Sequence, residues 1–228
     1  MRPTDQQLLK QTPLYAELGP AVADRVFRNA AVQTVRRGAT VFHQGDVATH
    51  VHVLLSGQVA LIAEDTALGP TIIEFFPAGE IFVAPAGLLE LPHLVSAKAI
   101  EDSRVLSMSA QELRGLIAAE SALAVAMTRA LARHWRLLVR QIKELKLKSA
   151  SQRLGSYLIA KAPVRAGATS FRLGEERKMI AARLGMTPES LSRAFAQLKT
   201  AGVSGRGRHI EIADVSTLSA HCRFEDQH

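Results

Sequence analysis

The segment from Glu175 to Val203, EERKMIAARLGMTPESLSRAFAQLKTAGV, is the strongest evidence in the sequence for a particular fold. The spacing of its apolar residues predicts two short amphipathic helices separated by a turn at Gly185. Thr187 suits the N-cap position of the second helix, and Pro188 suits its first helical position, where the missing N–H costs nothing. This pattern is typical of a helix-turn-helix, whose second helix enters the major groove of DNA.

The second helix carries polar side chains that suit base recognition. Arg193 can bond to guanine O6 and N7, Glu189 can accept from the amino group of cytosine or adenine, and Ser192 can contact a base edge or a thymine methyl. Downstream, SGRGRHIEI at residues 204–212 predicts a hairpin of the winged type that presents cations to phosphates, with His209 beside them. The predicted DNA-binding residues are Thr187, Glu189, Ser190, Ser192, Arg193, Arg206 and Arg208.

Charge supports this prediction. Residues 129–228 hold 19 Lys and Arg against 8 Asp and Glu, whereas residues 1–128 hold 9 against 13. A basic C-terminal part behind an acidic N-terminal part indicates a nucleic-acid-binding module attached to another domain. The length of 228 residues is enough for two modest domains with their own cores.

The predicted secondary structure changes twice in the N-terminal half of the chain. Residues 6–30 predict one or two short helices, and the chain is predicted to be helical again from Ala110. Between them, from Ala31, short β-rich runs predict strands: VQTV, TVFHQ, HVHVLLSG, QVALIAE, TIIEFF and SRVLSMS. Evenly spaced strands with glycine turns indicate a small barrel or roll, in which the glycines provide positive φ angles. These turn glycines are Gly38, Gly45, Gly57, Gly69 and Gly79.

A long helix is predicted next, with an apolar seam in alternating steps of three and four residues from Thr128 to Leu145. Such a seam favours self-association, although the stripe would also suit packing against the roll. The polar segment from Lys146 to Ser151 is the predicted hinge, and Ser149 or Ser151 is expected to cap the following helix. The predicted dimer interface is Leu131, Trp135, Leu138, Ile142 and Leu145.

The predicted fold class is therefore α+β. An N-terminal cupin-like β-roll is predicted over residues 1–118. A dimerisation helix and hinge occupy residues 119–148, and a winged helix-turn-helix occupies residues 149–228.

This arrangement resembles the Crp/Fnr superfamily of bacterial transcription regulators from about Leu8 to Ala213. Three segments carry the resemblance: RRGATVFHQGDVATHVHVLLSGQVAL at the opening of the roll, PAGEIF at Pro77–Phe82, and GMTPESLSRAFAQL at the recognition helix. The resemblance implies that residues 1–118 form a cyclic-nucleotide-binding-like domain that senses an effector. It also implies a homodimer that binds double-stranded DNA, with RNA polymerase as a further expected partner.

The recognition helix indicates a branch of that family. Glu189-Ser190-Leu191-Ser192-Arg193 is similar to the Glu-x-x-Ser-Arg pattern of the fumarate–nitrate regulators, and Pro188 stands where the cyclic-AMP receptors would have an extra arginine. The half-site that this resemblance implies is TTGAT, repeated in inverted orientation about one helical turn away.

The effector is less constrained. Family members that bind cyclic nucleotides have a Gly-Glu pair and then Arg-Ser, but the aligned positions here are Val83-Ala84 and Leu91-Pro92. A phosphate buried without such partners is unfavourable, so the sequence argues against cyclic AMP. The single cysteine, Cys222, also argues against an iron–sulfur cluster.

The combination of a Glu-x-x-Ser-Arg helix with neither a cysteine cluster nor the nucleotide-binding residues resembles the denitrification and nitric-oxide-responsive branch of the family. Sensing in that branch is generally linked to haem. Haem is therefore a candidate cofactor, with His93 and His134 as candidate ligands, whereas His43, His50 and His52 are expected to be exposed. Two alternatives to haem sensing stay open: a regulator that senses another small molecule, and a constitutive regulator without an effector.

The sequence argues against three other kinds of protein. His50 and His52 would begin a metal triad on one strand face, but no third ligand is apparent, so neither an enzyme nor a firm metal site is expected. No secretion signal follows Met1, and charges interrupt the longest apolar segment. We therefore expect a cytoplasmic protein that does not bind a membrane.

Overall fold

The computed structural model describes residues 1–64, 70–82 and 84–222. Contacts divide the chain into two compact units, Met1–Trp135 and Arg136–His228, and their boundary falls within helix α6 (Ser121–Leu147). The sequence-based division treats this helix as a segment of its own, whereas the contacts assign its two parts to different units.

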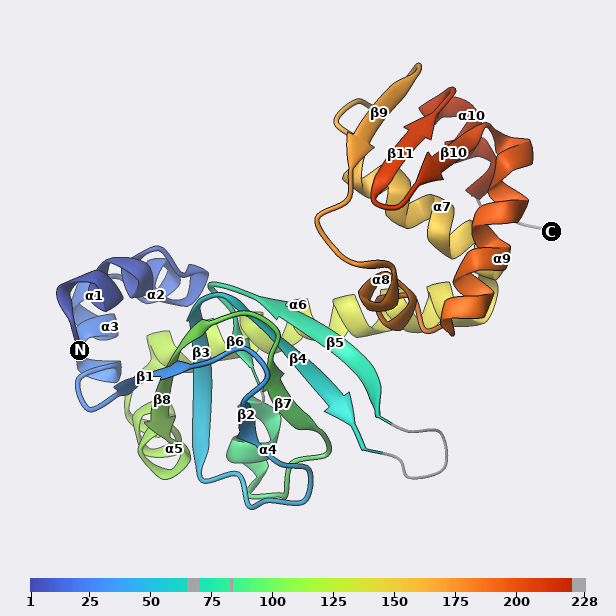
Figure 1. The fold of residues 1–228 in the computed structure, drawn as a ribbon. Coiled ribbons are helices and arrows are strands. Elements are labelled where there is room, and N and C mark those ends of the chain that lie inside the picture. Colours follow the sequence, from blue (N-terminus) through green and yellow to red (C-terminus); the bar gives the residue numbers. More distant parts are fainter. Residues whose placement is uncertain (65–69, 83, 223–228) are drawn as a thin grey trace. The chain divides into compact units, whose positions relative to one another are not determined.

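Three short helices open the first unit, where the sequence predicted one or two (Figure 1). They are α1 (Pro3–Lys10), α2 (Pro13–Leu18) and α3 (Pro20–Val26). Each begins with a proline in its first turn, and a proline cannot continue a preceding helix without losing a hydrogen bond. The prolines therefore divide residues 3–26 into three helices.

Two four-stranded antiparallel sheets form the roll. The first has the order β1-β8-β3-β6 and the second has the order β2-β7-β4-β5. The runs that the sequence predicted as strands are strands, and β6 and β7 are two that it did not predict. The strands are β1 (Ala31–Val35), β2 (Thr40–Phe42), β3 (His50–Ser56), β4 (Gln58–Ala63), β5 (Thr71–Pro77), β6 (Ile81–Phe82), β7 (Ser96–Ala99) and β8 (Ser103–Ser109).

Strand β3 is buried on both of its faces, from Val51 to Leu55. One face contributes Leu54 to an inner core between the sheets, together with Phe42, Phe76 and Phe82. The other face packs into a second core with α1–α3 and with the helices that follow the roll, α5 (Ala110–Ala119) and the start of α6. The short helix α4 (Ala84–Leu89) lies between β6 and β7.

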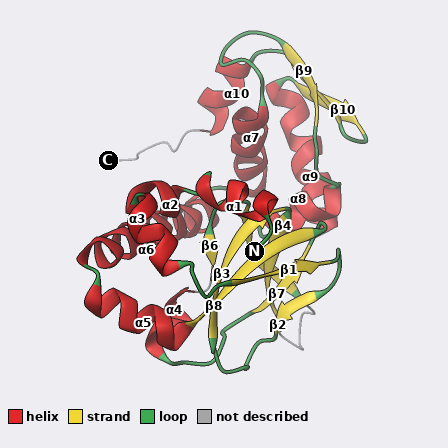
Figure 2. Ribbon diagram, turned by 90° about the vertical axis from the view of Figure 1, so that its left-hand side faces the viewer, coloured by secondary structure: helices red, strands yellow, loops and turns green. Residues whose placement is uncertain are grey.

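Beyond its share of α6, the second unit packs helices against a small antiparallel sheet with the order β10-β11-β9 (Figure 2). Leu154, Leu158, Ile180, Leu191 and Leu198 are among the residues of its core. Its elements are α7 (Ala150–Lys161), β9 (Thr169–Arg172), α8 (Arg177–Arg183), α9 (Pro188–Leu198), the 3-10 helix η1 (Lys199–Ala201), β10 (Val203–Arg206), β11 (His209–Ile212) and α10 (Val215–Cys222).

The predicted fold class is confirmed: a β-roll, a long helix and a winged helix-turn-helix follow one another along the chain. Gly38, Gly45, Gly57 and Gly79 have positive φ angles, as predicted for turns, and Gly69 lies outside the described residues. Within the described ranges, no single helix is long and apolar enough to cross a membrane, although the sharply bent pair α5 and α6 together meets the length and composition criteria.

Candidate DNA-binding surface and effector pocket

Helices α8 and α9 meet at a tight turn. Gly185 has a φ of 61°, and the Met186 amide donates to the Ala181 carbonyl over 3.0 Å. Thr187 caps α9, because its hydroxyl oxygen accepts from the Ser190 amide at 3.2 Å. Pro188 follows in the first turn. The helix-turn-helix geometry predicted from the sequence is thus present.

The first turns of α9 present a row of exposed polar side chains: Glu189, Ser192 and Arg193. Arg193 Nη2 donates to Ser190 Oγ over 3.2 Å, and Ser192 Oγ donates to the Pro188 carbonyl over 3.0 Å. Hydrogen bonds from its own backbone amide and from Thr187 lower the pKa of Glu189. The carboxylate is therefore a hydrogen-bond acceptor at neutral pH.

The wing is the β10–β11 hairpin, which turns at Gly207 with a φ of 63°. Arg206 is exposed on it. Arg208 instead reaches back to Glu176, with 3.2 Å between Nη2 and Oε1, and to the Gly174 carbonyl at 3.4 Å. A phosphate would therefore have to compete with Glu176 for Arg208, whereas no ion pair of Arg206 is found among the described residues.

The predicted seam of α6 is largely uncovered in the single chain. Trp135 is 68% exposed, Ile142 is 52% exposed and Leu145 is 50% exposed. Leu131 is also exposed, whereas Leu138 is half-buried. Such a row of large apolar side chains on one helix is unusual for a surface that faces only water.

A small pocket lies between the roll and α6. Residues of β5, β6, α4 and α6 line it: Phe76, Ile81, Pro85, Met127, Ala130, Leu131 and His134. His134 stacks on Phe76 with 5.5 Å between ring centroids, and its Nε2 lies 3.6 Å from Oε2 of the buried Glu74. The pocket is thus apolar, with one imidazole–carboxylate pair at its edge.

The pocket is too small for a large ligand as it stands. Its cavity volume is about 30 Å³, whereas sites that enclose drug-sized ligands measure ~300–1,000 Å³. A haem held by His134 does not fit this space, and none of the described lining residues is a Lys or Arg that could neutralise a phosphate.

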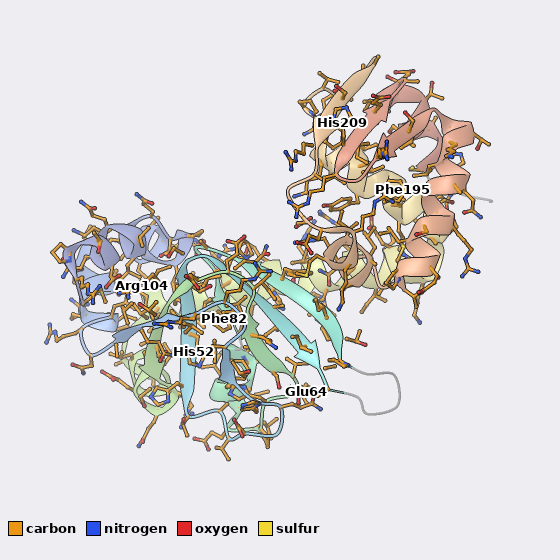
Figure 3. All side chains as sticks on the ribbon, viewed as in Figure 1. His52, Glu64, Phe82, Arg104, Phe195 and His209 are labelled. Carbon is orange, nitrogen blue, oxygen red and sulfur yellow. The ribbon has the colours of Figure 1, made fainter. Side chains whose placement is uncertain are left out.

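His93 and His52 are both buried, and their rings stack on Phe42 with 3.8 and 5.5 Å between centroids. Figure 3 shows His52 within the roll, near Phe82. Burial lowers the pKa of His93, and burial together with the nearby His50 and His93 lowers the pKa of His52 to about 4. His93 Nδ1 is buried without a hydrogen-bond partner among the described atoms. Its ring packs against the face of the Phe42 ring.

The prediction that His52 is exposed is wrong, because only 7% of this residue is accessible. His52 points into the inner core, stacks on Phe82 at 5.4 Å, and bonds through Nδ1 to Ser107 Oγ at 2.9 Å. His43 and His50 are exposed, as predicted. Within the described part of the chain, no group of three or more His, Cys, Asp or Glu is placed to hold a metal ion.

The positions aligned with the phosphate-binding residues of cyclic-nucleotide-binding relatives provide no free guanidinium among the described residues. Leu91 is exposed, Pro92 bridges to Val47, and Val83 lies outside the described residues. Arg104, the next arginine in sequence, lies on β8, where its Nη2 atom is 2.6 Å from Oδ2 of the buried Asp5.

Sequence reasoning missed several residues that hold the DNA-binding elements together. The Arg177 guanidinium lies 4.2 Å from the centroid of the Phe195 ring on α9, and its Nε donates to the Gly207 carbonyl of the wing over 3.1 Å. Tyr157 on α7 donates to Glu175, which also accepts from Arg183 Nη2 at 2.8 Å. These contacts join residues far apart in the sequence, so no local pattern marks them.

Comparisons with known proteins agree with this architecture. The family model for a cyclic nucleotide-binding domain matches residues 32–120, and the model for a Crp-like helix-turn-helix domain matches residues 152–221. The transcriptional activator protein Anr of Pseudomonas aeruginosa is 28% identical over 191 residues, which cover 82% of this chain and 78% of the relative. The cyclic AMP receptor protein of Thermus thermophilus is 25% identical over 211 residues, which cover 92% of this chain and 96% of the relative.

Solved structures share the fold. A CooA variant from Carboxydothermus hydrogenoformans superposes with a TM-score of 0.73 at 19% identity, covering 93% of this chain and 96% of that one. FixK2 from Bradyrhizobium japonicum superposes with a TM-score of 0.65 at 22% identity, covering 84% of this chain and 96% of that one.

The fold and the two matched domains define a DNA-binding transcription regulator with an effector-binding domain. Within that class the chain belongs to the Crp/Fnr superfamily, and its relatives include activators of the fumarate–nitrate type.

Proposed function

We propose that the protein is a homodimeric, effector-responsive bacterial transcription regulator that binds an inverted repeat of TTGAT-type half-sites. The observation that carries this proposal is the exposed row Glu189, Ser192 and Arg193 at the N-terminal end of α9. An acceptor, a hydroxyl and a guanidinium in this order suit a major-groove edge that offers an amino group, a thymine methyl and a guanine.

Phosphate contacts would fix the orientation of this helix on the duplex. Arg206 is exposed at the end of β10, and Arg208 would join it once its pair with Glu176 opens. Thr187 and Ser190 lie at the start of α9, where the positive end of the helix dipole favours a phosphate and their hydroxyls can contact one.

The dimer partner is a second copy of the same chain. The exposed side chains of Leu131, Trp135, Ile142 and Leu145 support this proposal, because a second seam would remove them from water. A two-fold dimer also matches a two-fold operator. Leu138→Glu is expected to give monomers in light scattering and to abolish operator binding; a stable dimeric variant would contradict this interface.

The effector site in this proposal is the pocket beside Phe76 and His134. Because its volume is about 30 Å³, any larger ligand must push α6 away from the roll as it enters. A ligand that binds the opened form more tightly would thereby shift the population of α6 arrangements. The apolar lining and the Glu74–His134 pair favour a small uncharged or cationic molecule over a cyclic nucleotide.

The pocket beside His134 gives haem little support, since its volume of about 30 Å³ is too small for that group unless α6 moves. The small pocket gives weight to a second candidate, a constitutive regulator whose roll is only a scaffold. We place the action of either candidate in the cytoplasm, with RNA polymerase as a partner.

Selection of preferred duplexes from random DNA, with and without haem and nitric oxide, tests the operator and the signal together. The proposal expects TTGAT palindromes to be enriched; dependence on neither additive would favour another ligand or constitutive binding. Arg193→Ala should cost about 1–3 kcal/mol on the matched site and relax the guanine preference, while weak salt-sensitive binding stays.

Lys199→Ala is the matched control, because it removes a positive charge from the opposite end of the same helix. It should leave the guanine preference intact. Unchanged base discrimination in the Arg193→Ala protein would refute the proposed recognition surface.

A further inference from the structure

The break between α6 and α7 consists of Lys148 and Ser149, within the polar segment 146–151, and side chains bridge it. Arg153, half-buried in the first turns of α7, donates from Nη1 to the Lys148 carbonyl over 2.9 Å. Its Nε donates to the Leu184 carbonyl over 3.1 Å. One guanidinium therefore bonds both the end of the long helix and the turn of the helix-turn-helix.

Two further contacts reinforce this bridge. Lys148 Nζ lies 2.8 Å from Glu144 Oε1 and 2.8 Å from Ser156 Oγ, so it ties the last turn of α6 to α7. The Leu145 side chain lies against Gly185, where an added Cβ would come within 2.8 Å of Leu145 Cδ2.

The helix start at Ser149 is also well formed. Its hydroxyl accepts from the Gln152 amide at 3.2 Å, and the Gln152 side chain accepts from the Ser149 amide at 2.9 Å. This reciprocal cap satisfies backbone donors that a loose linker would leave to water. The segment predicted as a hinge thus has a complete set of local contacts on both sides.

We propose that Arg153 is a positioning residue that makes the end of α6 and the helix-turn-helix move as one body. The fork shape of a guanidinium matters here, because its Nε and Nη1 reach two carbonyls in different elements, which a single ammonium cannot do in the same geometry. Arg153 would then set the distance between the two recognition helices of a dimer without touching a base. This inference rests on the proposed operator binding, and it concerns the rigidity behind that binding.

The first test measures how affinity depends on the spacer between half-sites. Each added base pair rotates one half-site about the duplex axis, so a rigid dimer should lose about tenfold or more in affinity per step away from the best spacer. Arg153→Lys keeps the positive charge but removes the forked guanidinium. In this variant the loss of DNA affinity for each base pair added to the spacer should shrink to about threefold. Binding to an isolated half-site should be unchanged.

Arg165→Lys is the matched control, because the same exchange is made at an exposed arginine of the same unit. It should keep the spacer dependence of the wild-type protein. A uniform loss of affinity at all spacers in Arg153→Lys, or an unchanged spacer dependence, would overturn the proposal.

The second test needs no DNA. The Lys148 amide donates to Glu144 and the Met186 amide donates to Ala181, and both bonds flank the Arg153 bridge. Hydrogen exchange in Arg153→Lys should accelerate at both amides together, by about tenfold, with no such change in Arg165→Lys. Acceleration at neither amide, or at only one, would overturn the inference.

The two tests separate the two proposals. A wild-type protein that ignores TTGAT palindromes would refute the operator assignment, and the exchange rates would still decide whether Arg153 couples the two elements.

Discussion

Replacing the buried His52 with phenylalanine should flatten the pH dependence of folding stability between about pH 7.5 and about pH 5. The His52 ring stacks on both Phe42 and Phe82, and burial lowers its pKa from 6.5 to about 4. As the pH falls below about 6.5, His52 is therefore protonated in the unfolded chain but stays neutral in the folded chain. The stability from this group is complete above pH 6.5 and is lost as the pH falls toward 4.

The size of this effect follows from the shift. About 1.5 pH units separate pH 5 from the unfolded pKa, and each unit is worth about 1.4 kcal/mol, so the wild-type protein should lose about 2 kcal/mol at His52 alone. A phenylalanine fits the aromatic stack, and Ser107, which gives up its bond to His52, is only half-buried.

Urea unfolding followed by circular dichroism at the two pH values measures the difference. The wild-type free energy of unfolding should fall by about 2 kcal/mol more than that of His52→Phe. His43→Gln, at an exposed position, should behave as the wild type because His52 remains. Parallel curves for wild type and His52→Phe would show that this imidazole does not carry the pH dependence.

Three further predictions concern other parts of the chain. Asp5→Asn should lower the free energy of unfolding by about 3 kcal/mol at neutral pH, measured by urea titration, because it leaves the Arg104 guanidinium without its anion. Hydrogen bonds from Arg104 lower the pKa of Asp5, so this penalty is present above the unfolded pKa near 3.8 and vanishes as the pH falls through the folded value; a constant penalty would contradict the pairing. Gly57→Ala should cost about 2 kcal/mol in thermal or chemical unfolding, since φ is +87° and the new Cβ would lie 2.7 Å from a backbone oxygen; a neutral variant would mean that this turn relaxes freely. Glu176→Gln should release Arg208 and raise non-specific DNA affinity a few-fold, with a steeper salt dependence by about one unit; an unchanged slope would place Arg208 off the phosphate path.

The recognition helix could be predicted because its signals are local. Thr187, Pro188 and Gly185 each act within a few residues of themselves, through a cap, a fixed φ and a positive φ. Most strands of the roll could likewise be predicted, from short runs of apolar residues between glycines.

His52 shows where such reasoning fails. Alternation along a strand predicts one dry face and one wet face, but β3 packs against the inner core on one side and against helices on the other. A polar residue in a strand buried on both faces is satisfied by distant partners, here Ser107 and two phenylalanine rings. The roles of Arg153 and Arg208 were hidden for the same reason, because their partners lie some thirty positions away.

The uncovered side of α6 also gives the protein an optical label of its own. The chain has one tryptophan, Trp135, and 68% of it faces water in the single chain. An indole that becomes covered by apolar side chains emits at shorter wavelength, so a dilution series of the unmodified protein would report the association constant directly. Ligands that open the neighbouring pocket would register in the same emission band, because His134, which lines that pocket, directly precedes Trp135 in the chain.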